Sequence, residues 1–145
     1  MPALPIQRDD ATAAFLDGTK RGEFLLVRDT VTGAVLPPQF DESADPRRYV
    51  RMPAAGTGTI VSWSVVHQRG ADGSVTRLPV GIVELDEGPW WWTSLPEADP
   101  DADLAGARVQ VAFETLGDGD AAEAIPYFRV TQRGPATAAC APAPA

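Results

Sequence analysis

Residues 58–67, Gly-Thr-Ile-Val-Ser-Trp-Ser-Val-Val-His, decide the fold, because β-branched and aromatic side chains dominate this stretch. Such a composition predicts a β-strand. The loop that follows, residues 69–74, contains Asp72-Gly73, a pair typical of a tight hairpin turn. Residues 77–85 are again rich in apolar and β-branched side chains, so we expect them to form the returning strand of a hairpin.

The rest of the C-terminal half continues as short strands separated by turns. Alternation of apolar and polar residues is clearest in residues 108–115, Arg-Val-Gln-Val-Ala-Phe-Glu-Thr. The acidic segment 96–106 between two strands could hold one helical turn, capped by Asp99 or Asp101. Five strands at this spacing match the plan of an OB-fold, whereas a two-sheet sandwich would normally need more strands. The further strands expected are residues 89–95, 108–115 and 124–131.

The N-terminal half has a mixed pattern. Asp9 or Asp10 can cap a short helix that runs toward Lys20. A strand over residues 23–28 and a short return over 34–36 then predict a hairpin, and residues 39–55 show no period, which favours irregular structure. The expected fold is therefore mainly β, a five-stranded OB-fold barrel with an N-terminal helix and hairpin. The expected units are residues 1–55, the OB-fold at 56–132, and a disordered Ala/Pro tail at 133–145.

The hairpin resembles a zinc knuckle whose cysteines are missing. A knuckle has the pattern Cys-x-x-Cys-Gly, and here Asp29 and Thr32 occupy the thiolate positions before Gly33. Asp41 and Ala44 occupy the positions where a second Cys-x-x-Cys pair would stand. A structural zinc ion needs four ligands, usually thiolate or imidazole. We therefore expect a metal-free hairpin without zinc, and residues 23–55 to be the least ordered part of the chain in isolation.

Composition narrows the function classes. The 145-residue chain has a formal net charge of −8 and a pI of about 4.5, which argues against binding to a nucleic-acid backbone. One cysteine, Cys140 in the Ala/Pro tail, excludes an internal disulfide and a cysteine-based metal site. Neither a membrane-length apolar run nor a signal peptide is evident, so a cytoplasmic protein is expected.

Several short motifs follow one another in a characteristic order and spacing. Their residues are Phe15, Gly18, Gly22, Phe24, Val27, Leu36-Pro37-Pro38, Gly56, Gly58, Ile60, Ser62, Val65-Val66-His67, Val80, residues 82–89, Val109, Val111, Phe113, Ile125-Pro126 and Phe128. Together, over about residues 12–131, they resemble the family called domain of unknown function 35, whose members are acyl-CoA-associated OB-fold proteins, with the four cysteine positions replaced. The resemblance implies a rubredoxin-like ribbon before the OB-fold, here without its zinc.

The resemblance also implies a role. Family members are accessory subunits that associate with thiolase-superfamily enzymes or with hydratases of the hot-dog fold. They support acyl-CoA chemistry in lipid, steroid side-chain or polyketide-type metabolism, while the partner carries out catalysis. The resemblance accordingly implies a non-catalytic subunit of such a complex, with acyl-CoA at the interface.

The candidate residues allow more than one interpretation. The run Trp90-Trp91-Trp92 must alternate across a strand, so part of it fills the core and part is available to a partner. Arg47, Arg48 and Arg51, with Lys20 and Arg21, could receive CoA phosphates if folded together. The single histidine, His67, would be needed if the chain were a stand-alone enzyme. A nucleic-acid-binding OB module is the remaining alternative.

Overall fold

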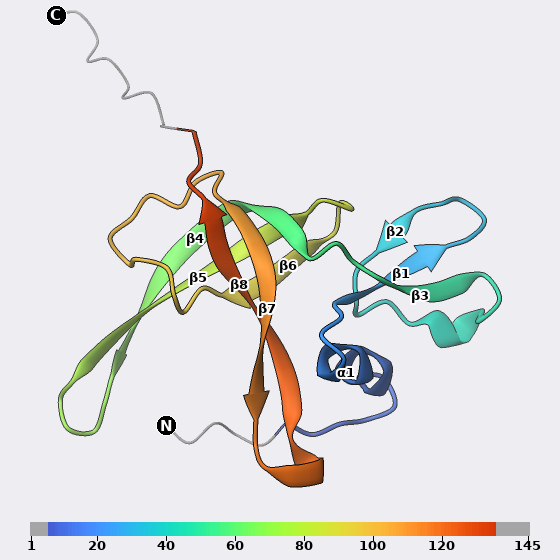
Figure 1. Ribbon diagram of the computed structural model, residues 1–145, viewed down its shortest axis with the longest axis horizontal. Coiled ribbons are helices and arrows are strands. Elements are labelled where there is room, and N and C mark those ends of the chain that lie inside the picture. The colour runs from blue at the N-terminus through green and yellow to red at the C-terminus, as the bar shows by residue number, and fades with distance from the viewer. Residues whose placement is uncertain (1–5, 136–145) are drawn as a thin grey trace, which may run out of the picture.

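The computed structural model describes residues 6–135, which form two antiparallel sheets and one α-helix (Figure 1). The expectation of a mainly β fold is confirmed. Cys140 and most of the expected Ala/Pro tail lie outside the described residues. In chain order the elements are α1 (Ala13–Lys20), β1 (Leu25–Asp29), β2 (Val35–Leu36), the 3-10 helix η1 (Glu42–Ala44), β3 (Tyr49–Pro53), β4 (Thr57–Arg69), β5 (Val75–Leu85), β6 (Trp90–Ser94), β7 (Arg108–Leu116), the 3-10 helix η2 (Gly119–Ala121) and β8 (Glu123–Gln132).

The larger sheet has the strand order β6-β5-β4-β7-β8. Its first strand, β4, pairs with both β5 and β7, as the first strand of an OB-fold does, and the predicted five strands are all present. A bulge between Ile60 and Ser62 bends β4, and the β4–β5 hairpin extends beyond the other strands (Figure 1). The acidic segment after β6 forms turns rather than the helical turn that was expected.

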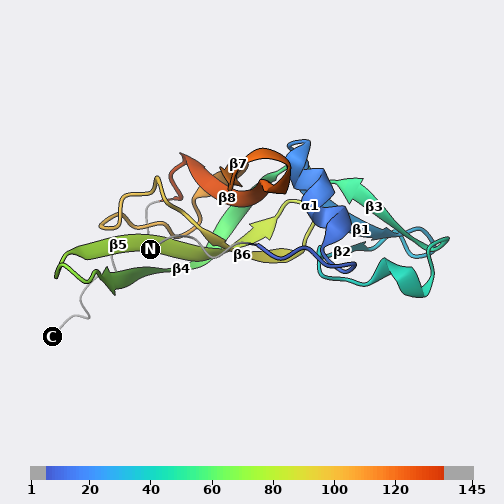
Figure 2. The same ribbon diagram turned by 90° about the horizontal axis from the view of Figure 1, so that it is seen from below.

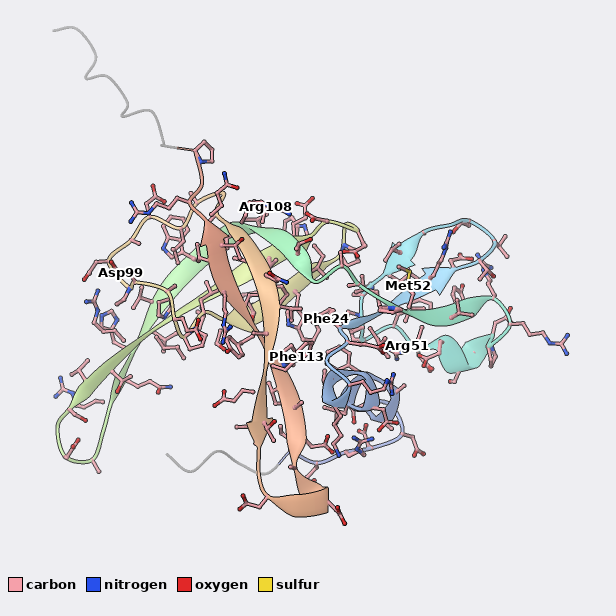
Figure 3. All side chains as sticks on the ribbon, in the orientation of Figure 1. Phe24, Arg51, Met52, Asp99, Arg108 and Phe113 are labelled. Atoms are coloured by element: carbon pink, nitrogen blue, oxygen red, sulfur yellow. The ribbon has the colours of Figure 1, made fainter. Side chains whose placement is uncertain are left out.

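The smaller sheet has the order β2-β1-β3, with β1 in the centre. The prediction that residues 39–55 are irregular was wrong, because β3 pairs along the whole of β1, from Leu25 opposite Pro53 to Asp29 opposite Tyr49. The N-terminal half is therefore a three-stranded sheet, not a hairpin alone. Figure 3 shows Arg51 and Met52 on β3, beside the 3-10 turn.

Helix α1 packs against β8 and β1, between the two sheets (Figure 2). The N-cap is Thr12 rather than the predicted Asp9 or Asp10, and Asp9 accepts a hydrogen bond from the Thr12 amide at 2.8 Å in the turn that leads into the helix. Gly22, at φ 76°, follows the last turn of the helix. A bidentate ion pair from Arg8 to Glu123 (Nε–Oε1 2.9 Å) ties the chain before the helix to the start of β8.

One hydrophobic core crosses the expected boundary at residue 55. Phe24 and Leu26, from the N-terminal half, are fully buried with Ile60, Val83 and Phe128 of the OB-fold strands. Phe24 lies at the junction of the two sheets (Figure 3). Its ring centroid is 6.1 Å from that of Phe128 on β8. Burial of this kind supplies most of the stabilising free energy, so the two halves stabilise one another.

Candidate partner-docking surface

The tryptophan run on β6 divides between the core and the surface. Trp91 points inward, and its ring centroid lies 5.1 Å from that of Phe24 and 5.6 Å from that of Phe15. The Phe24 contact is edge-on, the geometry that aromatic pairs favour. Trp91 therefore fills the end of the barrel beneath helix α1, which is the core half of the sequence interpretation.

The other two tryptophans point to solvent. Trp92 is 76% exposed and Trp90 is 57% exposed, because neighbours on a strand alternate between its faces. Ile82 of β5 lies opposite both Trp92 and Ser62, so these three share a row across the sheet. We call the surface on this side of β4, β5 and β6 the outer face. Its apolar residues are Val66, Leu78, Val80, Ile82, Trp90 and Trp92.

The charged residues of the outer face lie toward the β5–β6 turn, in the row of paired residues next to the row that contains Trp92. Glu84 lies opposite Trp90 and accepts a hydrogen bond from its indole N–H at 3.3 Å. Arg108 of β7 belongs to the same row, because Thr59 of β4 lies opposite both Glu84 and Arg108. Arg108 donates a hydrogen bond to the Thr59 hydroxyl at 2.9 Å. Arg108 also donates hydrogen bonds from both terminal nitrogens to the Asp86 carboxylate, at 2.7 and 2.8 Å. Among residues 6–135 the arginine is thus neutralised, while Glu84 has no cation beside it.

The Asp86–Arg108 pair makes a pH-dependent contribution to folding. Hydrogen bonds from Arg108 and Thr57 lower the pKa of Asp86 to about 2, below the value near 3.9 of an unfolded aspartate. A lowered pKa in the folded state stabilises the protein above the unfolded pKa, and this stability is lost as the pH falls through the folded pKa. We expect the urea midpoint to fall between about pH 4 and pH 2, and to fall less steeply in Asp86→Asn. An equal slope in Asp86→Asn and in the control Asp118→Asn would contradict this assignment.

The arginines proposed for CoA phosphates are not gathered into one site. Arg48 is paired with Asp29 (NH2–Oδ2 2.8 Å) and Arg51 with Glu42 (NH2–Oε2 2.8 Å). Arg47 is exposed, and no ion-pair partner is found for it among the residues described. The remaining two expected cations are also paired, Lys20 with Glu123 and Arg21 with Glu23. Sequence reasoning missed these partners because they are distant along the chain or sit in turns without a recognisable motif.

The knuckle-like turns are closed by carboxylates. Asp29 Oδ1 accepts hydrogen bonds from the amides of Val31 (2.9 Å) and Thr32 (3.3 Å), while Arg48 binds both carboxylate oxygens. These hydrogen bonds hold the pKa of Asp29 well below its ordinary value, and those from Arg48 have the largest effect. Asp41 closes its own turn by accepting from the Ser43 amide at 2.9 Å.

The donor set of these turns does not fit the zinc ion that the family ribbon implies. Zinc sites in ribbons use four thiolate or imidazole ligands, whereas Asp29 is held by a guanidinium and Ala44 has no donor. Within residues 6–135, no group of three or more His, Cys, Asp or Glu side chains is placed to hold a metal ion. The Asp29–Arg48 pair occupies the place where the first knuckle would bind metal.

His67 lies exposed near the end of β4, opposite Arg77. In the described part of the chain, its Nδ1 lies 3.2 Å from the Val65 carbonyl, and Arg77 is paired with Asp101. Nucleophilic or acid–base catalysis would need a second group within hydrogen-bond reach of the imidazole. The surroundings of His67 thus give no support to a stand-alone enzyme.

A hollow lies beside the loop between β6 and β7. Leu104, Ala107 and Val130 form its apolar wall, with Glu97 and Arg133 also lining it. Its volume of about 170 Å³ is smaller than the 300 to 1,000 Å³ usual for ligand pockets. The outer face differs from this hollow in exposing two tryptophans, residues that are enriched at interface hot spots.

The strand order and the exposed aromatic face define an OB-fold protein with an N-terminal three-stranded sheet. Residues 52–114 match the family described as "ChsH2, C-terminal OB-fold domain". This match lies in the OB-fold part of the chain and agrees with the resemblance to the domain of unknown function 35 family.

Comparison with solved structures agrees with this fold. A chain from a structure described as "Ltp2-ChsH2(DUF35) aldolase" superposes with a TM-score of 0.65 and 23% sequence identity, over 90% of this chain and 98% of that one. No curated protein matches the chain. Within the described residues, no helix is both long and apolar enough to cross a membrane.

Proposed function

We propose that this protein is a non-catalytic accessory subunit that binds a thiolase-superfamily enzyme in the cytoplasm and supports its acyl-CoA chemistry. The observation that carries the proposal is the outer face, where Trp90 and Trp92 are exposed beside a row of aliphatic side chains. Large contiguous apolar patches on soluble proteins commonly mark interaction sites, and tryptophan is enriched at interface hot spots. Strands two and three of an OB-fold, here β5 and β6, are also its usual ligand-binding surface.

The solved structure supports a protein partner. Its description names two components, Ltp2 and ChsH2, and an aldolase activity. By analogy, the partner's reaction would be cleavage or formation of a carbon–carbon bond in an acyl-CoA, within lipid or steroid side-chain metabolism. Zinc plays no part in this proposal, since the carboxylates of the knuckle-like turns do not suit it.

The test is affinity purification of the full chain from its native host, followed by mass spectrometry and assay. We expect a stoichiometric complex with a thiolase-superfamily enzyme whose activity on acyl-CoA falls when this chain is absent. His67→Ala should leave that activity unchanged, because the imidazole has no catalytic neighbour. Capture of a hot-dog hydratase instead would replace the thiolase part of the proposal. Acyl-CoA turnover by the chain alone, abolished in His67→Ala, would refute the accessory role.

A further inference from the structure

We infer that the outer face binds a protein partner whose surface presents two features. One is an apolar cluster that covers Trp92, and the other is a basic side chain that pairs with Glu84. This inference rests on the proposed function, because it takes the partner to be a protein and assigns the face that binds it. It adds what the partner must present and where.

The pairing register sets the apolar part of this surface. Trp92 and Ile82 share one row, and Val80 lies in the next, where it pairs with Ser94 of β6 and Ser64 of β4. In these two rows Ile82 and Val80 on β5 are aliphatic, whereas the β4 positions opposite them, Ser62 and Ser64, are serines. This part of the outer face therefore has a large side chain, Trp92, on β6, aliphatic side chains on β5 and little side-chain volume on β4. A partner side chain can lie over the serines with its flank against Ile82 and Trp92.

Charge decides between a protein and an anionic ligand. Glu84 carries the exposed carboxylate of the outer face, and its observed hydrogen bond comes from the neutral Trp90 indole. The arginine in the same row, Arg108, is already bound on both terminal nitrogens by Asp86. A nucleic acid or the phosphates of CoA would bring negative charge next to Glu84 without a free cation to receive it. A lysine or arginine on the partner would complement this carboxylate and favour the encounter.

The position of the charge also predicts the orientation of the complex. Glu84 lies on β5 two residues from Ile82, so the basic side chain must contact the face near the β5–β6 turn. The apolar cluster then extends from Trp92 toward Leu78 and Val66 on the projecting hairpin. Tryptophan is among the residues that contribute most to binding when a partner surrounds it.

The experiment uses the purified partner complex and its full-length variants. Trp92→Ala should raise the dissociation constant by about tenfold or more, since interface tryptophans are frequent hot spots. Glu84→Gln should raise it by about threefold to tenfold and weaken the dependence of the association rate on salt. The matched controls are Val31→Ala, which shortens an apolar side chain 75% exposed in the β1–β2 turn, and Asp118→Asn, which removes a carboxylate from the β7–β8 turn. Both controls should bind like the wild type.

Three results would overturn the assignment, and each differs from failure of the proposed function. A complex that forms normally with Trp92→Ala and Glu84→Gln would show that another face binds the partner. Self-association of the purified chain, lost in Trp92→Ala, would make a second copy the occupant. Salt-dependent binding of single-stranded DNA, lost in the same variant, would make it a nucleic acid. If instead no thiolase-superfamily complex exists, the proposed function itself fails.

Discussion

We expect replacement of Trp91 by alanine to lower the free energy of unfolding by about 3 kcal/mol, and the same change at its neighbour Trp92 to alter it by less than about 0.5 kcal/mol. The two residues are adjacent on β6 but face opposite sides of the sheet. Trp91 packs on Phe15 of the helix and Phe24 of β1, so its removal leaves a cavity where the two sheets and the helix meet. Trp92 is mostly in water and loses few contacts within the chain.

Urea denaturation followed by far-UV circular dichroism measures this difference, because tryptophan fluorescence itself changes in both variants. Trp91→Phe is the conservative control and should recover most of the lost stability, since an aromatic ring still meets Phe24. Equal destabilisation in Trp91→Ala and Trp92→Ala would contradict the division of the run between core and surface.

Loss of the Arg48 guanidinium opens the smaller sheet. In Arg48→Met the carboxylate of Asp29, which is 5% exposed, keeps its turn amides but loses both bonds from the guanidinium. A buried charge without its partner is unfavourable, so the turn after β1 should open more often. We expect limited proteolysis within residues 30–48 to be about tenfold faster than in the wild type, with the OB-fold strands still protected.

Arg47→Met is the matched control, because Arg47 is the neighbouring exposed arginine and its charge meets no carboxylate in the part of the chain described. The same samples should contain no stoichiometric zinc, and a chelator should leave their cleavage rate unchanged. One equivalent of zinc in the wild type, or equal cleavage of Arg48→Met and Arg47→Met, would refute the role given to the Asp29–Arg48 pair.

Local pattern predicted most of the OB-fold. The alternation in residues 108–115 and the β-branched run in 58–67 correspond to β7 and β4, because a half-buried strand imposes a period of two on its own sequence. β3 was missed for a related reason. Its five residues, Tyr-Val-Arg-Met-Pro, include an arginine and end in proline, and their pairing depends on β1, which is distant in sequence.

The candidate site was predicted only in part. The period of a strand was enough to separate Trp91 from Trp90 and Trp92, although it could not tell which face was inside. The arginines were harder, because an ion pair is a tertiary contact. Arg48 is 19 residues from Asp29, and nothing in the intervening sequence indicates that β3 returns to the end of β1. A basic cluster in the sequence was therefore interpreted as a phosphate site, although Arg48 and Arg51 are each paired with a carboxylate.

The contacts that join the two ends of the chain also constrain when it can fold. Arg8 is bound to Glu123, 115 residues later, and Phe24 of β1 meets Phe128 of β8. On the ribosome, the N-terminal residues emerge long before these partners exist, so Phe24 must remain without its final neighbours until β8 has been synthesised. Contacts so distant in sequence slow folding. The barrel is thus expected to close only once β8 has emerged from the ribosome, and until then its aromatic core remains available to chaperones.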